Sequence, residues 1–168
     1  MPTVILKLGD DVSTDVIYPG RFMATVLPSE TPKYAFADFA EWNTRLQSGE
    51  IAPGGVVVAE NNFGCGSSRE QAASTLKGWD ITVVAKNYSR IFLQNAINLG
   101  LQTVICPDLE ASEGDELDIL PHKVINKTSG REFNREPLPP ARQAIVEAGG
   151  LIPYARKKLL EMRGAGAS

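Results

Sequence analysis

The residues with the clearest chemical potential lie in one stretch near the middle of the chain, residues 61–70, with the sequence NNFGCGSSRE. The apolar run VVVA at residues 56–59 precedes it and is typical of a strand buried on both faces. Gly64 and Gly66 permit positive φ angles, so the turn after this strand can bring backbone N–H groups close to a ligand.

A helix is expected to follow this turn. The hydroxyl of Ser67 and the carboxylate of Glu70, three residues later, form a capping-box pattern that predicts a helix from Ser67 to about Lys77. The start of such a helix attracts anions, and Arg69 adds a two-pronged donor for a carboxylate or phosphate. Ser67, Ser68 and Arg69 therefore predict an anion site. The simpler alternative is that Ser67 is only a helix cap and Arg69 only a surface residue.

The cysteines and the histidine give weaker signals. Cys65 lies in the same turn, but no base can be placed beside it from the sequence, which favours a small packed residue over a nucleophile. His122 lies in a polar turn and is expected to be solvated. With only Cys65, Cys106 and His122, the chain is not expected to hold a structural zinc or an iron–sulfur centre by itself.

Composition narrows the class of protein. The chain has 168 residues with ordinary proportions of hydrophobic (43%) and charged (22%) residues, which fits one globular domain. Its net charge of −3 gives no indication of nucleic-acid or anionic-membrane binding. No apolar run is long enough to span a bilayer and the N-terminus lacks signal-peptide features, so we expect a cytoplasmic location.

Apolar patterning predicts an α/β fold in which strands and helices alternate. The expected strands are 3–8, 56–59, 81–85, 103–105, 116–120, 124–126 and 131–134. The expected helices are 33–42, 67–77, 88–99, 141–148 and one from about residue 152, so the C-terminal helices occupy about 141–163. The segment 11–32 carries three prolines and shows no steady period. We expect it to be a functional loop that is mobile, because it has little to pack.

Three motifs together resemble a known family. NNFGCGSSRE, NYSRIFLQNAINLGL at residues 87–101 and GDDVSTDVIYPGRFM at residues 9–23 are similar to the small subunits of 3-isopropylmalate dehydratase, which are equivalent to the swivelling domain of aconitase. The resemblance covers most of residues 9–101 and is weaker beyond Pro107. It implies a single compact three-layer β/β/α domain over residues 1–168.

The resemblance also implies a reaction and a partner. In this family a separate large subunit holds a [4Fe–4S] cluster, and the two subunits assemble as a heterodimer or a heterotetramer. Together they isomerise 2-isopropylmalate and 3-isopropylmalate by dehydration and rehydration, in leucine biosynthesis. This chain would bind no cofactor itself and would be active only with its partner.

Site residues follow from matching the motifs position by position. Ser67 matches the general base, Arg69 the arginine that holds a substrate carboxylate, and Ser68 the supporting hydroxyl. Asp15 matches an acidic active-site residue, and Arg21 lies in the segment that contributes substrate contacts.

The specificity loop departs from the pattern usual in the family. Phe22, Met23, Ala24 and Thr25 stand where Tyr-Leu and a varied pair are common. Because Phe22, Met23 and Ala24 carry no charge, they favour a substrate with an apolar substituent such as isopropyl or methyl. The small subunit of a homoaconitase or of a dimethylmalate- or citramalate-type dehydratase remains an alternative. A stand-alone anion-binding module is a further one, although it would have no need of the STDVIYPGRFM segment.

Overall fold

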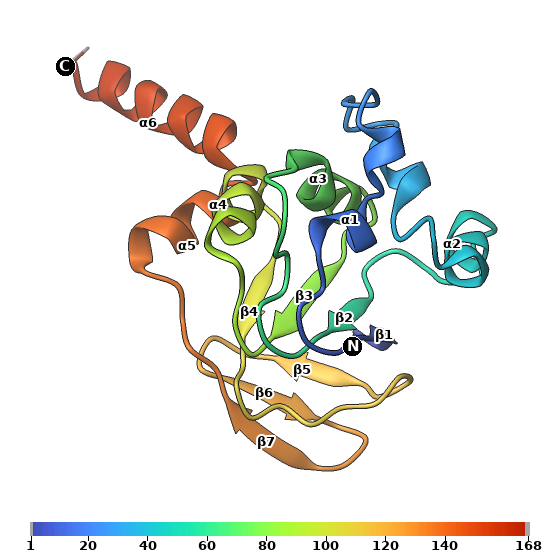
Figure 1. Cartoon of the computed structure of the whole chain (residues 1–168). Coiled ribbons are helices and arrows are strands. Elements are labelled where there is room, and N and C mark those ends of the chain that lie inside the picture. The colour runs from blue at the N-terminus through green and yellow to red at the C-terminus, as the bar shows by residue number, and fades with distance from the viewer. Residues whose placement is uncertain (1, 167–168) are drawn as a thin grey trace.

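The computed structural model describes residues 2–166 and is built around a parallel four-stranded sheet (Figure 1). The strand order is β1-β2-β3-β4, so each strand pairs with the next along the chain. The strands are β1 (Val4–Lys7), β2 (Val56–Val58), β3 (Thr82–Ala85) and β4 (Thr103–Ile105). All four lie within the predicted ranges, since continuous valine-rich runs mark strands that are covered on both faces.

The two faces of this sheet bury different sets of valines. Val57 and Val83 belong to the core on the helical side, whereas Val56, Val58 and Val84 belong to the core on the opposite side. Successive strand residues point to opposite faces, so the run VVV alone supplies both cores.

A second sheet covers the face opposite the helices. It is antiparallel and contains β5 (Leu117–Ile119), β6 (Lys123–Asn126) and β7 (Arg131–Asn134) in that order. Leu117, Val124 and Phe133 pack from it against the parallel sheet. The layers are therefore sheet, sheet and helices, and the predicted three-layer β/β/α fold is confirmed (Figure 1).

The helices of the third layer are α3 (Glu70–Gly78) and α4 (Arg90–Leu99), which contact each other. Each follows the carboxyl end of a strand and runs back along the sheet, as in a parallel α/β unit. The observed α4 begins two residues later than the predicted 88–99, because Tyr88 is held outside the helix. Its hydroxyl donates to the carbonyl of Val83 or Val104, both 2.9 Å away.

The region between β1 and β2 departs from prediction. The expected helix 33–42 is wrong: a 3-10 helix, η2 (Thr31–Tyr34), and α2 (Ala40–Gln47) flank an irregular stretch in which Phe36 has a φ of 49°. Phe36 is fully buried in this conformation, so its packing outweighs local helix propensity.

The segment 11–32 packs more closely than its composition suggests. It contains α1 (Thr14–Ile17) and the 3-10 helix η1 (Gly20–Phe22), and the side chains of Ile17 and Tyr18 are fully buried. The premise that this segment has little to pack is therefore wrong for its first half. The mobility predicted for residues 11–32 stays a prediction, and Met23, Val26 and Leu27 in the second half of the segment are exposed.

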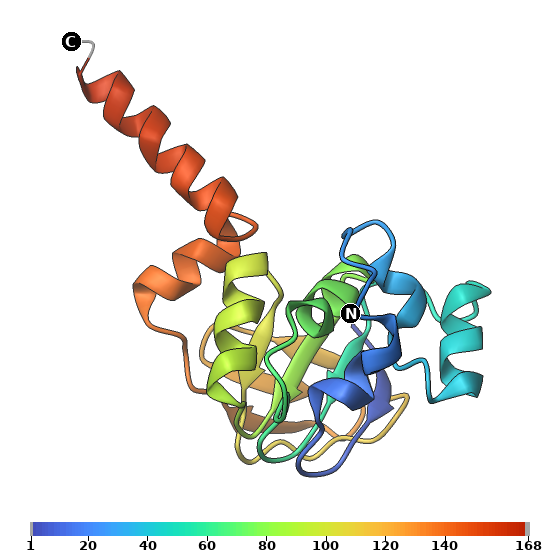
Figure 2. The same cartoon turned by 45° about the horizontal axis from the view of Figure 1, so that its top comes forward.

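Two helices end the described chain. They are α5 (Pro140–Glu147) and α6 (Leu151–Gly166), in agreement with the helices predicted from 141 and 152. Figure 2 shows α6 extending away from the rest of the molecule. Among residues 2–166, no helix has the length and apolar character needed to cross a membrane.

Candidate active site

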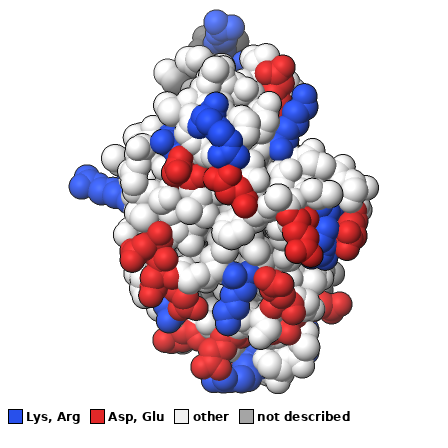
Figure 3. Space-filling view, turned by 45° about the vertical axis from the view of Figure 1, so that its right-hand side comes forward, with Lys and Arg blue, Asp and Glu red and all other residues white. Residues whose placement is uncertain are grey.

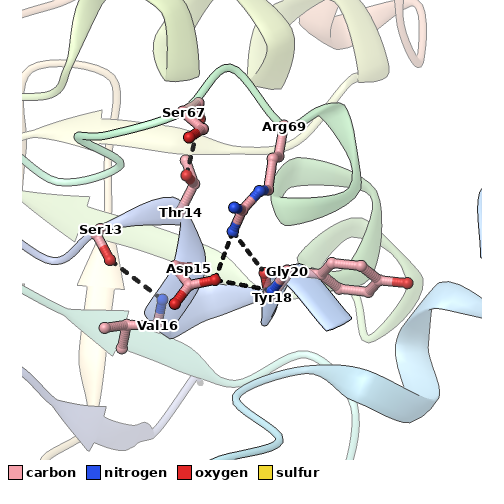
Figure 4. Close-up of polar contacts among 8 residues, drawn as sticks. All are labelled: Ser13, Thr14, Asp15, Val16, Tyr18, Gly20, Ser67 and Arg69. Atoms are coloured by element: carbon pink, nitrogen blue, oxygen red, sulfur yellow. Dashed lines mark hydrogen bonds and ion pairs between the residues drawn. The ribbon is translucent and has the colours of Figure 1, made fainter. Parts of the chain in front are cut away.

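Two segments far apart in sequence lie side by side beyond the carboxyl ends of β1 and β2. The N–H of Gly64 donates to the carbonyl of Val12 (2.7 Å), and the N–H of Thr14 donates to the carbonyl of Cys65 (2.8 Å). The hydroxyl of Thr14 adds a 2.7 Å hydrogen bond to the carbonyl of Ser67 (Figure 4). These bonds join the STD and GSSR motifs. Ligands commonly bind at this edge of a parallel sheet.

Arg69 and Asp15 form the central ion pair of this region. Arg69 Nη1 lies 2.6 Å from Asp15 Oδ1 and also donates to the carbonyl of Tyr18 at 3.4 Å (Figure 4). The Arg69 side chain is only 14% exposed, whereas that of Asp15 is 63% exposed. The hydrogen bond from Arg69, followed by one from the N–H of Gly20, lowers the pKa of Asp15. Asp15 is therefore an exposed carboxylate that holds a largely buried guanidinium in place.

Gly20 allows this close approach. A Cβ at this position would lie 3.0 Å from Arg69 Nη2 and 3.2 Å from Asp15 Oδ1. The N–H of Gly20 donates to the same Oδ1 at 2.7 Å. A side chain at this position would require the ion pair to shift by a few tenths of an ångström.

The predicted capping box is wrong. Helix α3 begins at Glu70, and Arg69 precedes it with extended backbone angles (φ −114°, ψ 110°) and no capping side chain. The pairing of residues 12–14 with the turn holds residues 64–67 outside the helix, and no local pattern reveals such a contact. The positive φ angles predicted at Gly64 and Gly66 are confirmed at 84° and 91°.

Ser67 and Ser68 lie exposed between this turn and α3. Within residues 2–166 the Ser67 hydroxyl makes no hydrogen bond, since Thr14 contacts its carbonyl instead. The hydrogen bond from Thr14 therefore holds the backbone of Ser67, while the Ser67 hydroxyl stays available to a ligand. The Nε of Arg69 is buried and lacks a hydrogen-bond partner among these residues.

Arg21 does not join this cluster. Its Nη2 lies 2.6 Å from Asp38 Oδ1, and both side chains are more than half exposed. The guanidinium also lies over the ring of Phe22, 4.6 Å from its centroid. The bond to Asp38 raises the pKa of Arg21, and the guanidinium is turned toward that carboxylate.

The predicted specificity loop, residues 22–25, contacts a small aromatic cluster. Phe22 stacks on Tyr34 with ring centroids 4.1 Å apart, and the Tyr18 hydroxyl lies 3.0 and 3.1 Å from the carbonyls of Phe22 and Thr25. Met23 and Ala24 are exposed. The carbonyl of Met23 accepts a hydrogen bond from Gln71 Nε2, so α3 also supports the loop.

Sequence reasoning missed Thr14, Tyr18 and Gln71. Thr14 and Tyr18 belong to the motif STDVIYPGRFM, so the resemblance contained them, but nothing in the sequence indicated which groups they would contact. Burial raises the pKa of the Tyr18 phenol, which keeps it a neutral donor to the loop. Gln71 gave no signal, because its role depends on the position of α3 beside the loop.

The described chain does not present a ligand set for a metal centre. Within residues 2–166, no group of three or more His, Cys, Asp or Glu side chains lies close enough to hold a metal ion. Both cysteines are free thiols, and burial raises the pKa of Cys106 to about 11. His122 is exposed, as predicted. The residues therefore do not fit an iron–sulfur cluster bound by this chain alone.

Comparison with known proteins identifies the family. Residues 11–109, which include both segments of the site, match the aconitase C-terminal domain. The chain belongs to this family. The match spans α3, α4, the strands β2 to β4 of the parallel sheet and every candidate site residue.

Individual relatives confirm the resemblance to 3-isopropylmalate dehydratase small subunits. One with that name from Methanosarcina mazei is 44% identical over 163 residues, covering 92% of this chain and 96% of the relative. An isopropylmalate/citramalate isomerase small subunit from Methanocaldococcus jannaschii is 37% identical over 166 residues, covering 94% of each. A crystal structure of a 3-isopropylmalate dehydratase from the same organism aligns over 97% of both chains, with 34% identity and a TM-score of 0.87.

Proposed function

We propose that this chain is the small subunit of a 3-isopropylmalate dehydratase, a hydro-lyase of leucine biosynthesis that works in the cytoplasm. The family and the names of its relatives support this assignment. The observation that carries it is the hydrogen-bonded pairing of the STD and GSSR motifs, which brings Asp15, Ser67 and Arg69 to one edge of the sheet.

Arg69 is proposed to bind a carboxylate of the substrate. Its guanidinium already holds one carboxylate, that of Asp15, at 2.6 Å. A guanidinium offers a planar fork that matches a carboxylate. The substrate carboxylate can bind beside Asp15 or replace it. Asp15 is 63% exposed, so water can solvate its carboxylate when the substrate displaces it.

Ser67 is proposed to take the proton from the substrate carbon, with Ser68 supporting the site. The helix dipole contributes at most about 2 kcal/mol to a nearby anion, which lowers a pKa by about one or two units. Because α3 begins three residues after Ser67, the contribution at this hydroxyl is smaller still. Other donors and a site closed to water must therefore activate Ser67. We accordingly expect the isolated chain to be inactive.

A large subunit is the proposed partner, in a heterodimer or a heterotetramer. The name "small subunit" of the relatives implies such a partner, and the exposed edge with Ser67, Ser68 and Asp15 is where it would close over the substrate. The partner is also proposed to hold the [4Fe–4S] cluster, since the described residues of this chain offer no ligand set. When bound, the cluster would supply a Lewis acid for the hydroxyl that leaves and returns.

The substrate is proposed to carry an apolar substituent beside its carboxylates. Met23 and Ala24 are exposed next to the aromatic cluster and bring no charge. Arg21, the nearest cation in sequence, is paired with Asp38. The relative named as an isopropylmalate/citramalate isomerase favours a second candidate, a methyl-substituted acid.

An anaerobic assay tests the proposal. This chain and the cluster-loaded large subunit from the same organism are assayed together and separately, with 2-isopropylmalate and citramalate. Turnover of 2-isopropylmalate in the mixture alone is expected. If the mixture converted citramalate but not 2-isopropylmalate, the proposed substrate would be wrong and the proposed reaction type would stand. Turnover by this chain alone would contradict the shared site, and failure to form a complex would favour a separate anion-binding module.

A further inference from the structure

Tyr18 contacts two parts of the candidate site at once, through opposite ends of the residue. Its carbonyl accepts a 3.4 Å hydrogen bond from Arg69 Nη1, on the guanidinium proposed to hold a substrate carboxylate. Its hydroxyl lies 3.0 Å from the carbonyl of Phe22 and 3.1 Å from that of Thr25, the first and last residues of the specificity loop. Because Tyr18 is fully buried, it connects these two parts from the interior of the chain.

Few side chains outside the specificity loop support its backbone. Among the described residues 2–166, only the side chains of Tyr18 and Gln71 form hydrogen bonds to residues 22–25. The Thr25 carbonyl has no other donor within that part of the chain, whereas the Phe22 carbonyl also accepts from the N–H of Thr25 at 3.0 Å. Removal of the Tyr18 hydroxyl would therefore leave the end of the loop at Thr25 without this support.

The specificity loop lies beside the proposed carboxylate site. Gln71, which donates to the Met23 carbonyl at 3.1 Å, follows Arg69 by two residues at the start of α3. On the other side, Gly20 precedes the loop by two residues, and a Cβ on it would lie 3.0 Å from Arg69 Nη2. Met23 and Ala24 are exposed between these two contacts. The loop therefore begins and is supported within a few residues of the guanidinium.

The two candidate substrates differ only in their apolar substituent. Both 2-isopropylmalate and citramalate carry two carboxylates and one hydroxyl, with an isopropyl group in the first and a methyl group in the second. Charge does not distinguish them, and Figure 3 shows acidic and basic side chains mixed on the side of the molecule where α2 lies. An apolar pocket does distinguish them, since one extra methylene group in such a pocket is worth roughly 10- to 200-fold. Selectivity therefore depends on how closely the loop is held against the substituent.

We propose that Tyr18 is a positioning residue that sets the selectivity of the site for the isopropyl group. Its carbonyl and its hydroxyl hold Arg69 and the specificity loop in one arrangement, in which Met23 and Ala24 pack against the substituent of an acid bound to Arg69. Tyr18 is fully buried and acts through these groups without touching the substrate. This selectivity rests on the proposed function, and its determinant lies outside the loop itself.

Tyr18→Phe and Tyr34→Phe are a matched pair of variants that isolate the Tyr18 hydroxyl. Both keep a ring of the same aromatic cluster, in which Tyr34 stacks on Phe22, but of the two only Tyr18 hydrogen-bonds through its hydroxyl within residues 2–166. In the assembled enzyme, Tyr18→Phe is expected to lower the ratio of kcat/KM for 2-isopropylmalate to that for citramalate roughly three- to tenfold, the factor of one hydrogen bond. KM for 2-isopropylmalate should change more than kcat. Tyr34→Phe should keep the parent ratio.

Gln71→Ala alters the support of the same loop without changing the core. Because Gln71 bonds to the Met23 carbonyl at the surface, its loss is expected to lower the substrate ratio by a similar factor. Gln143→Ala is the control, since Gln143 also lies on a helix but donates to Glu147 within α5. A lower ratio in Gln71→Ala with the parent ratio in Tyr18→Phe would overturn the role of Tyr18. Circular dichroism verifies that all four variants fold.

Hydrogen–deuterium exchange on this chain alone measures the support of the loop without any activity. The backbone amides of residues 22–25 are expected to exchange at least about twofold faster in Tyr18→Phe than in the parent chain or Tyr34→Phe. Equal exchange in all three chains would overturn the proposal even where the enzyme works as proposed. Faster exchange with an unchanged substrate ratio would also overturn it. Failure of the parent mixture to convert either acid would instead contradict the proposed function, and the selectivity with it.

Discussion

Arg69 and Asp15 form an ion pair at 2.6 Å across 54 residues of sequence, and the partly buried guanidinium is thereby held ready at an exposed edge of the sheet. Asp15 occupies the position that a carboxylate ligand would take on the fork. Its second hydrogen bond, from the N–H of Gly20, fixes it in that position. Arg69 is thus oriented for a carboxylate before substrate arrives, and a substrate that replaces Asp15 must break both of its hydrogen bonds.

Arg69→Lys is expected to weaken substrate binding. A lysine retains the charge but loses the planar fork and the second donor, which is worth about 1.5–3 kcal/mol for a charge-assisted hydrogen bond. The KM of the assembled enzyme should therefore rise roughly 10- to 100-fold, with a smaller change in kcat. Arg45→Lys, in the remote pair with Glu50, is the control and should leave both constants unchanged. An unchanged KM in Arg69→Lys would remove Arg69 from the substrate site.

Asp15 is expected to contribute to the acid sensitivity of the fold. Its pKa is lowered below the ordinary 3.8, first by the hydrogen bond from Arg69 and then by that from Gly20. A carboxylate with a lowered folded pKa stabilises the protein above pH 3.8, and this contribution is lost as the pH falls through the folded value. Exposure of Asp15 keeps the contribution small.

Urea unfolding of Asp15→Asn between about pH 2 and 6 measures this contribution. The free energy of unfolding should fall less steeply below about pH 4 in the variant than in the parent chain. Superimposable pH profiles would show that the ion pair does not stabilise the fold.

Sequence patterns predicted the parallel sheet well because its signals are local. Val56–Val58 and Thr103–Ile105 are short valine- or isoleucine-containing runs flanked by turn residues, and burial on both faces makes such runs conspicuous. The start of α3 was predicted wrongly, because the pairing of Thr14 with Cys65 depends on residues 51 positions away. The residues next to Ser67 in sequence give no indication of this distant contact.

The site was predictable in its parts but not in its connections. Resemblance placed Asp15, Ser67 and Arg69 in one site, and the structure brings Asp15 and Arg69 into contact. Arg21 lies near enough to lower the pKa of Asp15 but makes its ion pair with Asp38 instead. The support that Tyr18 gives the specificity loop was also hidden, because a hydroxyl bonded to two backbone carbonyls leaves no pattern in the sequence.

Ser67→Ala should abolish turnover without weakening the fold. Within residues 2–166 its hydroxyl has no hydrogen-bond partner and it caps no helix, so no folded-state contact is lost. Loss of a general base typically costs about 100- to 10,000-fold in rate. The assembled enzyme should show that loss in kcat, with an unchanged melting temperature. Ser68→Ala is the neighbouring control, with a smaller loss. Equal activity of Ser67→Ala and the parent enzyme would exclude Ser67 as the base.

Thr14 is expected to act on catalysis through the backbone of Ser67. Thr14→Val removes the 2.7 Å hydrogen bond to the Ser67 carbonyl while nearly preserving shape, at a cost of about 1 kcal/mol in stability. We expect kcat to fall and KM to change little, since Arg69 keeps its own contacts. Thr14→Ser retains the hydroxyl and should restore kcat. A loss of stability without a change in kcat would limit Thr14 to a structural role.

Gly64 and Gly49 offer a matched test of how tightly the turn before Ser67 is packed. Both have positive φ angles, 84° and 83°, but a Cβ on Gly64 would lie 2.2 Å from Phe92 Cγ, whereas one on Gly49 would meet nothing within 4 Å. Alanine in this backbone region costs about 1–2 kcal/mol at either position. The clash with the buried Phe92 adds about 1–3 kcal/mol at Gly64 alone.

Urea unfolding should therefore show a larger destabilisation for Gly64→Ala than for Gly49→Ala, and only the former should reduce kcat. The reason is that a displaced turn carries Cys65 and Ser67 with it, together with their bonds to Thr14. Equal destabilisation by the two substitutions would mean that the turn yields around Phe92. The contact between the glycine turn and α4 would then not be what fixes the position of Ser67.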